Sequence, residues 1–252
     1  MHPILIKLGP LTIYSYGFMA ALGFLVGVLA TIYFARKQGI SVELILDLAI
    51  YVIIAAIFGA RLFYVIGDWE QYKNNWLEIF MLQNGGLVFL GGLIFATLAV
   101  FIYAKTKGLP YLKILDVITP GVFLGQAIGR IGCFLNGCCF GLPTKMPWGL
   151  VFPKGSLASE FFPWQHIHPT QLYSSLSVLI IFGLIIIVVR FKKFDGQVFL
   201  SGLIFYSIYR FIVEFFRYSP IHWWKLTPSQ WIVMIIFAVA LYGWVYLKKK
   251  NR

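Results

Sequence analysis

The sequence predicts an all-α, polytopic membrane protein with seven transmembrane helices. Of its 252 residues, 60% are hydrophobic and only 12% are charged, which is too little polar surface for a soluble globule of this size. A helix needs about 20 mostly apolar residues to cross a hydrocarbon core of about 30 Å. Because the apolar runs are continuous rather than alternating, we expect helices and not barrel strands. The seven runs lie near residues 13–35, 44–66, 87–104, 112–129, 170–190, 197–216 and 229–247.

Basic residues predict how the helices are oriented. If the seven runs alternate, Lys and Arg cluster at the helix ends of one side, as in Arg36 and Lys37 and the tail KKKNR. Cytoplasmic ends carry this excess, so we expect the N-terminus outside and the C-terminus in the cytoplasm. No small-residue cleavage pattern follows the first run, which we therefore expect to be a retained helix.

The formal charge of +12 does not indicate nucleic-acid binding. The basic residues are dispersed as pairs at helix ends, and they form no stripe with stacking aromatics between them. Attraction to anionic lipid headgroups explains them better, so we expect the lipid bilayer and no nucleic acid as a partner.

We expect one domain, 1–252, because no fixed repeat and no long polar linker divides the chain. Two connections stand out, and both lie outside in the predicted orientation. Residues 67–86 mix Trp and Tyr with acidic residues, as is typical of a segment along the headgroups. Residues 130–169 form the longest irregular stretch, with five prolines. Long loops of this kind often carry function.

The sixth run contains charges in the sequence FYSIYRFIVEFFR. Arg210, Glu214 and Arg217 are spaced i, i+4, i+7 and share one helical face, which Tyr206 extends by one turn. Charges in a membrane helix are costly unless they are paired or reach water. One interpretation is a ladder that neutralises itself and fixes helix packing. However, two arginines and one glutamate leave a positive charge.

An anionic substrate is the alternative counter-ion. Arg61 and Arg130 lie at the outer ends of other runs, and guanidinium groups hold phosphate bidentately while remaining charged. We therefore predict a site for a lipid phosphate that opens to the outer leaflet.

All three cysteines fall within GRIGCFLNGCCFG, residues 129–141. Zinc would need a fourth ligand such as His166 or His168, and the spacing lacks a C-x2-C pair. A Cys133–Cys138 disulfide suits an oxidising compartment. Apolar packing is the commonest role of buried cysteines and is the interpretation we favour, with no metal site expected.

The same segment resembles the signature of the prolipoprotein diacylglyceryl transferase family. Other pieces follow in the family's order, so that the similarity spans nearly the whole chain. These pieces are YSYG at 14–17, GARLFYV at 59–65, GGLVFLGG at 85–92, HPTQLY at 168–173 and YRFIVEFFR at 209–217.

The resemblance implies a seven-helix enzyme of the bacterial inner membrane. Such an enzyme moves the diacylglyceryl group of phosphatidylglycerol to the lipobox cysteine of a prolipoprotein signal peptide and releases glycerol phosphate, without a cofactor. Arg130 and Arg210 match the family's essential arginines and are expected to be catalytic. The expected substrate-binding residues are Tyr16, Arg61, Asn136, Gly141, His168, Gln171, Tyr206, Glu214 and Arg217.

Several positions depart from the family pattern. Leu90 aligns with the family's histidine, Cys133 and Cys138 replace an asparagine and an acidic residue, and Ser174 stands where glutamate is common. His168 is an alternative base, although an orienting role in its loop is favoured. Three other functions stay open: transfer to another acceptor, a non-catalytic lipid-binding scaffold, and a transporter. The transporter is weaker, because paired half-helices are missing.

Overall fold

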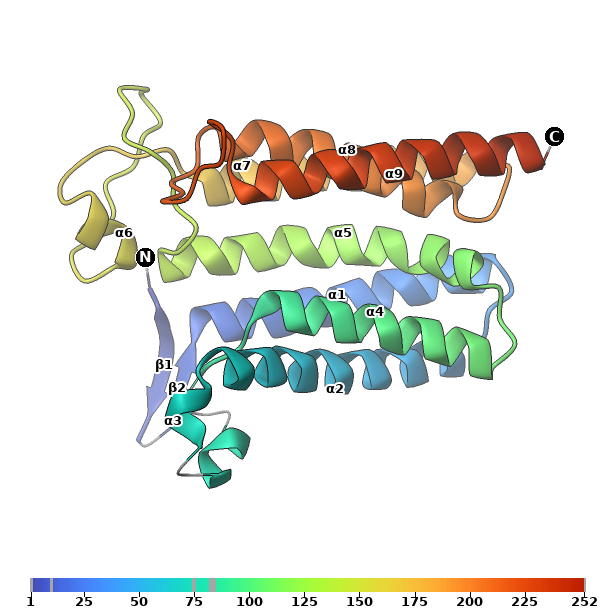
Figure 1. Ribbon diagram of the computed structural model, residues 1–252, viewed down its shortest axis with the longest axis horizontal. Coiled ribbons are helices and arrows are strands. Elements are labelled where there is room, and N and C mark those ends of the chain that lie inside the picture. The colour runs from blue at the N-terminus through green and yellow to red at the C-terminus, as the bar shows by residue number, and fades with distance from the viewer. Residues whose placement is uncertain (1, 10, 74–75, 82–84, 252) are drawn as a thin grey trace. The chain divides into compact units, whose positions relative to one another are not determined.

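The computed structural model describes residues 2–9, 11–73, 76–81 and 85–251. Within these residues seven helices are long and apolar enough to cross a membrane, which confirms the predicted class (Figure 1). Each predicted run overlaps one of them. They are α1 (Ser15–Lys37), α2 (Val42–Gly67), α4 (Phe89–Thr106), α5 (Tyr111–Asn136), α7 (Thr170–Arg190), α8 (Gln197–Glu214) and α9 (Pro228–Lys250).

The largest difference from the sequence-based boundaries is the end of α5. We expected an irregular stretch from residue 130, but the helix continues to Asn136, so Arg130 lies inside it. Glycines at 129 and 132 weaken helical propensity without ending the helix. Gly137 ends it, because its φ of 73° is left-handed. A short helix, α6 (Leu157–Phe161), interrupts the remainder of the predicted loop.

The N-terminal segment forms an antiparallel hairpin that we did not expect. Strand β1 (Ile4–Leu8) pairs with β2 (Leu11–Tyr14), and α1 begins directly after it. In the predicted interfacial segment 67–86, the structure contains α3 (Trp69–Tyr72) and a 3-10 helix, η1 (Trp76–Phe80). Residues 74–75 and 82–84 of that segment lie outside the described residues.

The chain divides into two compact units, residues 1–34 with 115–252, and residues 35–114. In the first unit α1 and α5 pack backbone to backbone. A Cβ atom on Gly23 would lie 2.6 Å from the carbonyl oxygen of Gly125, and one on Gly27 would lie 2.8 Å from that of Gly121. Glycines four residues apart on both helices therefore permit this close approach.

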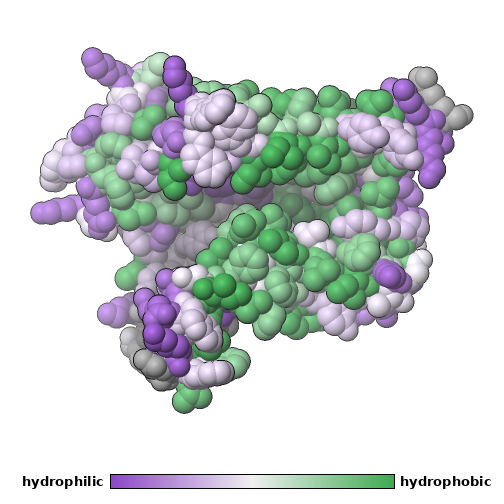
Figure 2. All heavy atoms as spheres, viewed as in Figure 1, coloured by the Kyte–Doolittle hydropathy of each residue, from purple (hydrophilic) through white to green (hydrophobic). Residues whose placement is uncertain are grey.

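Helix α8 is joined to α5 by buried polar contacts. Asp116 on α5 is fully buried, and its carboxylate accepts hydrogen bonds from the backbone N–H groups of Gly196 and Phe199 at the start of α8. Helices α8 and α9 lie side by side (Figure 1). Hydrophobic side chains cover much of their exposed flank, and hydrophilic ones gather near the C-terminal end of α9 (Figure 2).

In the second unit α2 packs against α4. A Cβ atom on Gly59 would lie 2.5 Å from the carbonyl oxygen of Gly91, so these glycines again allow direct backbone contact. Arg61 lies half a turn further along α2, at the end from which the segment 68–81 continues.

Candidate active site

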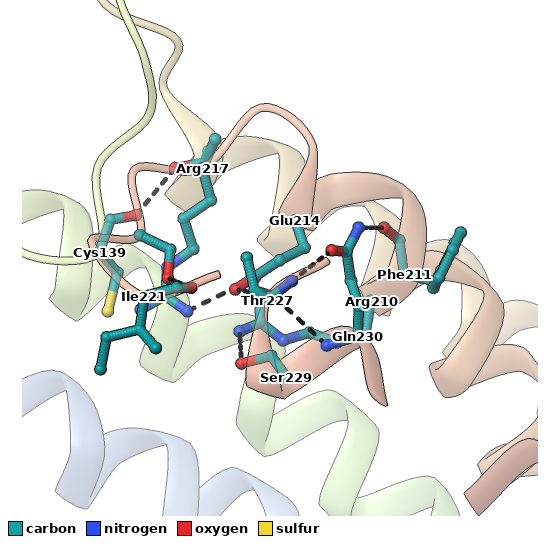
Figure 3. Close-up of polar contacts among 11 residues, drawn as sticks. Cys139, Arg210, Phe211, Glu214, Arg217, Ile221, Thr227, Ser229 and Gln230 are labelled. Atoms are coloured by element: carbon teal, nitrogen blue, oxygen red, sulfur yellow. Dashed lines mark hydrogen bonds and ion pairs between the residues drawn. The ribbon is translucent and has the colours of Figure 1, made fainter. Parts of the chain in front are cut away.

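Arg210 and Glu214 at the end of α8, together with Arg217 just after the helix, form a cluster of charged side chains (Figure 3). Nη1 of Arg210 lies 2.8 Å from Oε2 of Glu214, and Nη1 of Arg217 lies 3.6 Å from the same oxygen. Two side chains from the start of α9 complete the cluster. The Thr227 hydroxyl donates to Oε1 of Glu214 at 3.1 Å, and Nη2 of Arg210 contacts Oγ of Ser229 at 3.4 Å.

One carboxylate therefore lies within ion-pair distance of two guanidinium groups. The Glu214 side chain is 2% exposed and that of Arg217 is 26% exposed. Among the described residues, Nε of Arg217 is buried and has no hydrogen-bond partner. An unsatisfied buried donor costs about 1 to 3 kcal/mol, and more when it is charged. The cluster thus has a surplus positive charge and an available donor, as an anion site requires.

Arg130 lies on α5 in the same unit. It is half-buried, and the described part of the chain shows no carboxylate paired with it. Its charge lies within electrostatic range of Tyr206 and Tyr209 on α8. Tyr206 is also in range of Arg210, so it links the two arginines that we expected to be catalytic. The buried hydroxyl of Tyr209 has no hydrogen-bond partner among the described residues.

The first turn of α7 holds the loop that follows α5. The Thr170 hydroxyl donates to the carbonyl oxygen of Cys139 at 2.8 Å, and Nε2 of Gln171 donates to that of Cys138 at 2.7 Å. Gln171 is 1% exposed, and its Oε1 atom is left without a partner within the described residues. Gln171 therefore both positions the loop and retains a free acceptor.

Gly141 lies where three backbone segments cross. Its N–H donates to the carbonyl oxygen of His168 at 3.1 Å, and it bridges to Arg217 in an antiparallel pair. A Cβ atom at this position would lie 2.5 Å from the His168 oxygen and 2.7 Å from the Phe216 oxygen. Only glycine fits without a backbone shift. The crossing joins the GRIGCFLNGCCFG segment directly to the arginine cluster.

His168 is fixed by a short hydrogen-bonded chain. Its Nδ1 lies 3.0 Å from the Tyr173 hydroxyl, which also accepts from Nε1 of Trp148 at 2.7 Å. Its ring packs edge-on against the ring of Phe216, with 5.2 Å between the two ring centroids. Burial lowers the pKa of the imidazole, so it is neutral near pH 7. This geometry supports the orienting role that we favoured for His168.

Tyr16 and Asn136 flank the cysteines. Tyr16, in the first turn of α1, lies within electrostatic range of Arg130 and of all three cysteines. Asn136 is the last residue of α5, and its side chain hydrogen-bonds the Cys138 thiol. Tyr16 therefore lies near Arg130, and a substrate-binding role for Tyr16 and Asn136 stays a prediction.

Arg61 and Leu90 belong to the second unit. The Arg61 side chain donates from Nε to the carbonyl oxygen of Ile79 at 2.8 Å, and from Nη1 to that of Gly85 at 2.6 Å. Its Nη2 donates to the Glu78 carbonyl oxygen at 2.6 Å. The guanidinium therefore organises this segment, and a substrate-binding role for Arg61 stays a prediction. Leu90 is exposed in the first turn of α4.

The three cysteines are free thiols, all half-buried, so the proposed Cys133–Cys138 disulfide is not formed. Their sulfur atoms all lie within 4.8 Å of one another. Hydrogen bonds from Cys133 and Cys138 lower the pKa of the Cys139 thiol, and Arg217 and Arg130 act in the same direction.

Three participants were not predicted from the sequence. Thr227 and Ser229 reach the cluster only because α9 begins beside the end of α8, and TPSQ by itself indicates no more than a helix start. Tyr209 adjoins Arg210 in sequence but lies off the i, i+4 stripe. Its proximity to Arg130 depends on how α5 packs.

Comparison with known proteins identifies related chains. The model of the family described as prolipoprotein diacylglyceryl transferase matches residues 3–246. Proteins named phosphatidylglycerol–prolipoprotein diacylglyceryl transferase are similar over nearly the full length. The one from Clostridium tetani is 37% identical over 96% of this chain and 96% of its own. The one from Nostoc sp. is 34% identical over 98% of this chain and 90% of its own.

Proposed function

The chain belongs to the prolipoprotein diacylglyceryl transferase family, and on this basis we propose that it is a phosphatidylglycerol–prolipoprotein diacylglyceryl transferase. It transfers the diacylglyceryl group of phosphatidylglycerol to the lipobox cysteine thiol of a prolipoprotein signal peptide. The products are a thioether and glycerol 1-phosphate.

The surplus of guanidinium groups over carboxylates is the observation that carries this proposal. Arg210 and Arg217 share the carboxylate of Glu214, and Arg130 contributes a further positive charge nearby. The lipid phosphate supplies the missing negative charge. Arginine suits this role, because its planar fork of donors matches two phosphate oxygens at once.

The reaction is a displacement at a glycerol carbon. The peptide sulfur forms a bond to the carbon that carries the phosphate ester, the carbon–oxygen bond breaks, and glycerol 1-phosphate leaves with the electron pair. Arg130 and Arg210 stabilise the negative charge that develops on the departing phosphate. This electrostatic stabilisation is strongest in a site with little water. Tyr16, Asn136, Tyr206 and Gly141 position the headgroup and the glycerol.

The thiol proton need not be removed by a dedicated base. A cysteine thiol has a pKa of about 8.5, so a few per cent is thiolate near pH 7, and nearby arginines increase that fraction. The reaction therefore tolerates Leu90 at the position where the family has a histidine. Neutral His168 is engaged with Tyr173 and contributes to the shape of the loop.

An apolar pocket between α8 and α9 offers a place for an acyl chain. It has a volume of about 440 Å³ and is lined by Ser207, Ile208, Phe211, Ile212, Val233, Met234 and Phe237. Phe211 directly follows Arg210 and Ser207 precedes it by three residues, so one lipid can place its phosphate at the arginines and a chain in this pocket. No metal or diffusible cofactor is needed for the displacement.

We assign the protein to the bacterial inner membrane, with the site toward the outer leaflet. This assignment is supported by basic residues in the last turns of α1, α4, α7 and α9, since such residues are commoner on the cytoplasmic side of a membrane. The arginine cluster follows the C-terminal end of α8, which is the opposite side in an alternating topology.

One assay separates this function from its alternatives. Purified protein in vesicles receives phosphatidylglycerol labelled in both the acyl chains and the headgroup, together with a lipobox peptide. Transfer of the acyl label to the peptide cysteine supports the proposal. Headgroup release without peptide modification indicates another acceptor, and binding of the lipid without either product indicates a scaffold. Phosphatidylethanolamine vesicles serve as the lipid control.

A further inference from the structure

The three thiols form a compact group that the proposed transfer does not use. Their sulfur atoms lie within 4.8 Å of one another. A metal–sulfur bond of about 2.3 Å would place three sulfur atoms about 4.0 Å apart around a trigonal ion. Small side-chain rotations therefore suffice to close the group around one ion. The thiols are only half-buried, so an ion can reach them.

The backbone brings adjacent residues into this group. Cys138 and Cys139 are neighbours in sequence, and neighbouring side chains of an extended chain point in opposite directions. Cys139 has a left-handed backbone, with a φ of 59°, which residues other than glycine rarely adopt. Thr170 and Gln171 hold the carbonyl oxygens of both residues, and so maintain the turn.

The surrounding charges favour an anionic metal complex. Arg130 and Arg217 both lie within electrostatic range of Cys139. Three thiols that bind one monovalent ion release three protons, and the complex then has two net negative charges. Two guanidinium groups balance that charge. In the described residues no histidine or carboxylate joins the thiols as a fourth ligand, which disfavours closed tetrahedral zinc.

We propose that Cys133, Cys138 and Cys139 form a trigonal thiolate site for a soft monovalent ion, Cu(I). Thiolates select soft ions of this kind, and three sulfur ligands suit Cu(I) better than Zn²⁺. This assignment goes beyond the proposed transfer and does not depend on it. One consequence does rest on the proposed function: the bound complex neutralises Arg130 and Arg217, and so weakens binding of the lipid phosphate.

Competition with a chromogenic Cu(I) chelator tests the site directly. Fully reduced, purified protein is titrated without oxygen, after a thiol reagent has confirmed three free cysteines. We expect the protein to withdraw about one equivalent of Cu(I) and X-ray absorption to show sulfur ligation by three atoms. Failure to withdraw Cu(I), or preferential binding of Zn²⁺, would overturn the assignment.

Variants show whether the cysteines are the ligands. Single Cys→Ser changes at the three positions should each weaken Cu(I) binding by at least about tenfold, since even supporting residues of metal sites contribute 10- to 100-fold. The double variant Cys133→Asn/Cys138→Glu introduces residue types that the family resemblance associates with these positions. It should fold, as its thermal unfolding reports, yet lose the site. Unchanged Cu(I) binding in the folded double variant would refute the proposal.

Discussion

Arg210 and Arg217 contact the same carboxylate oxygen of Glu214, at 2.8 and 3.6 Å. Glu214 carries one negative charge and also accepts a hydrogen bond from Thr227, so it cannot neutralise both guanidinium groups. The ladder is therefore not self-neutralising in the way that a purely structural ion pair would be. It leaves a positive charge beside Arg130, and this surplus underlies the proposed phosphate site.

Glu214→Gln should both destabilise the protein and reduce transfer. Glutamine retains the size of the side chain and a partner for Thr227, but it leaves the buried Arg210 and the half-buried Arg217 without a counter-charge. Breaking a buried ion pair in this way costs about 3 to 5 kcal/mol. Thermal unfolding in detergent, followed by tryptophan fluorescence, measures the change.

Glu160→Gln is the matched control for that substitution. Glu160 is exposed on α6, so the same chemical change should alter stability by less than about 0.5 kcal/mol. Equal stability of the Glu214→Gln and Glu160→Gln variants would contradict the role assigned to the buried carboxylate.

Gly141→Ala should distort the crossing that joins the loop to the arginine cluster. The added Cβ atom would lie 2.5 Å from the carbonyl oxygen of His168, so the backbone must shift, at a cost of about 1 to 3 kcal/mol. We expect slower transfer and a lower unfolding temperature.

Gly129→Ala provides the control in the same segment. No heavy atom lies within 4 Å of a Cβ atom built there, and alanine favours helix by about 1 kcal/mol over glycine. This variant should be as stable as the wild type or more stable. A loss of stability similar to that of Gly141→Ala would show that the crossing is not the cause.

The pH dependence of stability should report His168. Burial lowers its pKa in the folded protein, whereas the unfolded chain takes up the proton near pH 6.5. Its contribution to stability is therefore complete above about pH 6.5 and is lost as the pH falls toward the lower folded pKa. His168→Gln should remove this part of the dependence in a series of unfolding curves.

The same variant distinguishes an orienting residue from a base. If His168 only positions its loop, the rate of transfer by His168→Gln should keep the wild-type pH profile, even if its magnitude falls. Loss of the acidic limb of the profile would instead identify His168 as the group that accepts the thiol proton.

The membrane helices could be predicted because each one is a long apolar run, and hydropathy alone defines such runs. The end of α5 could not be predicted, because the glycines at 129 and 132 indicate the end of a helix in the sequence but lie within the helix in the structure. The hairpin at Ile4–Leu8 and Leu11–Tyr14 was missed because its strands are short and adjoin an apolar helix.

In the candidate site, too, the local arrangement could be predicted from the sequence and the contacts between distant segments could not. Arg210, Glu214 and Arg217 share a face by helical spacing alone, so the sequence was sufficient to group them. The contacts of Thr227 and Ser229 join residues at least 13 positions apart and depend on how α9 packs. The sequence likewise favoured apolar packing for the cysteines. Their mutual proximity depends on the left-handed turn at Cys139.

The most direct measurement is the rate of diacylglyceryl transfer by Arg130→Ala and Arg130→Lys, with lipid consumed and thioether formed counted in the same reaction. Wild type should form one thioether for each glycerol 1-phosphate released. Arg130→Ala should lose at least about 100-fold in rate, as removal of a preorganised charge-stabilising donor does, and lysine should restore only part of it. Undiminished transfer by folded Arg130→Ala, or lipid cleavage without thioether in the wild type, would contradict the account.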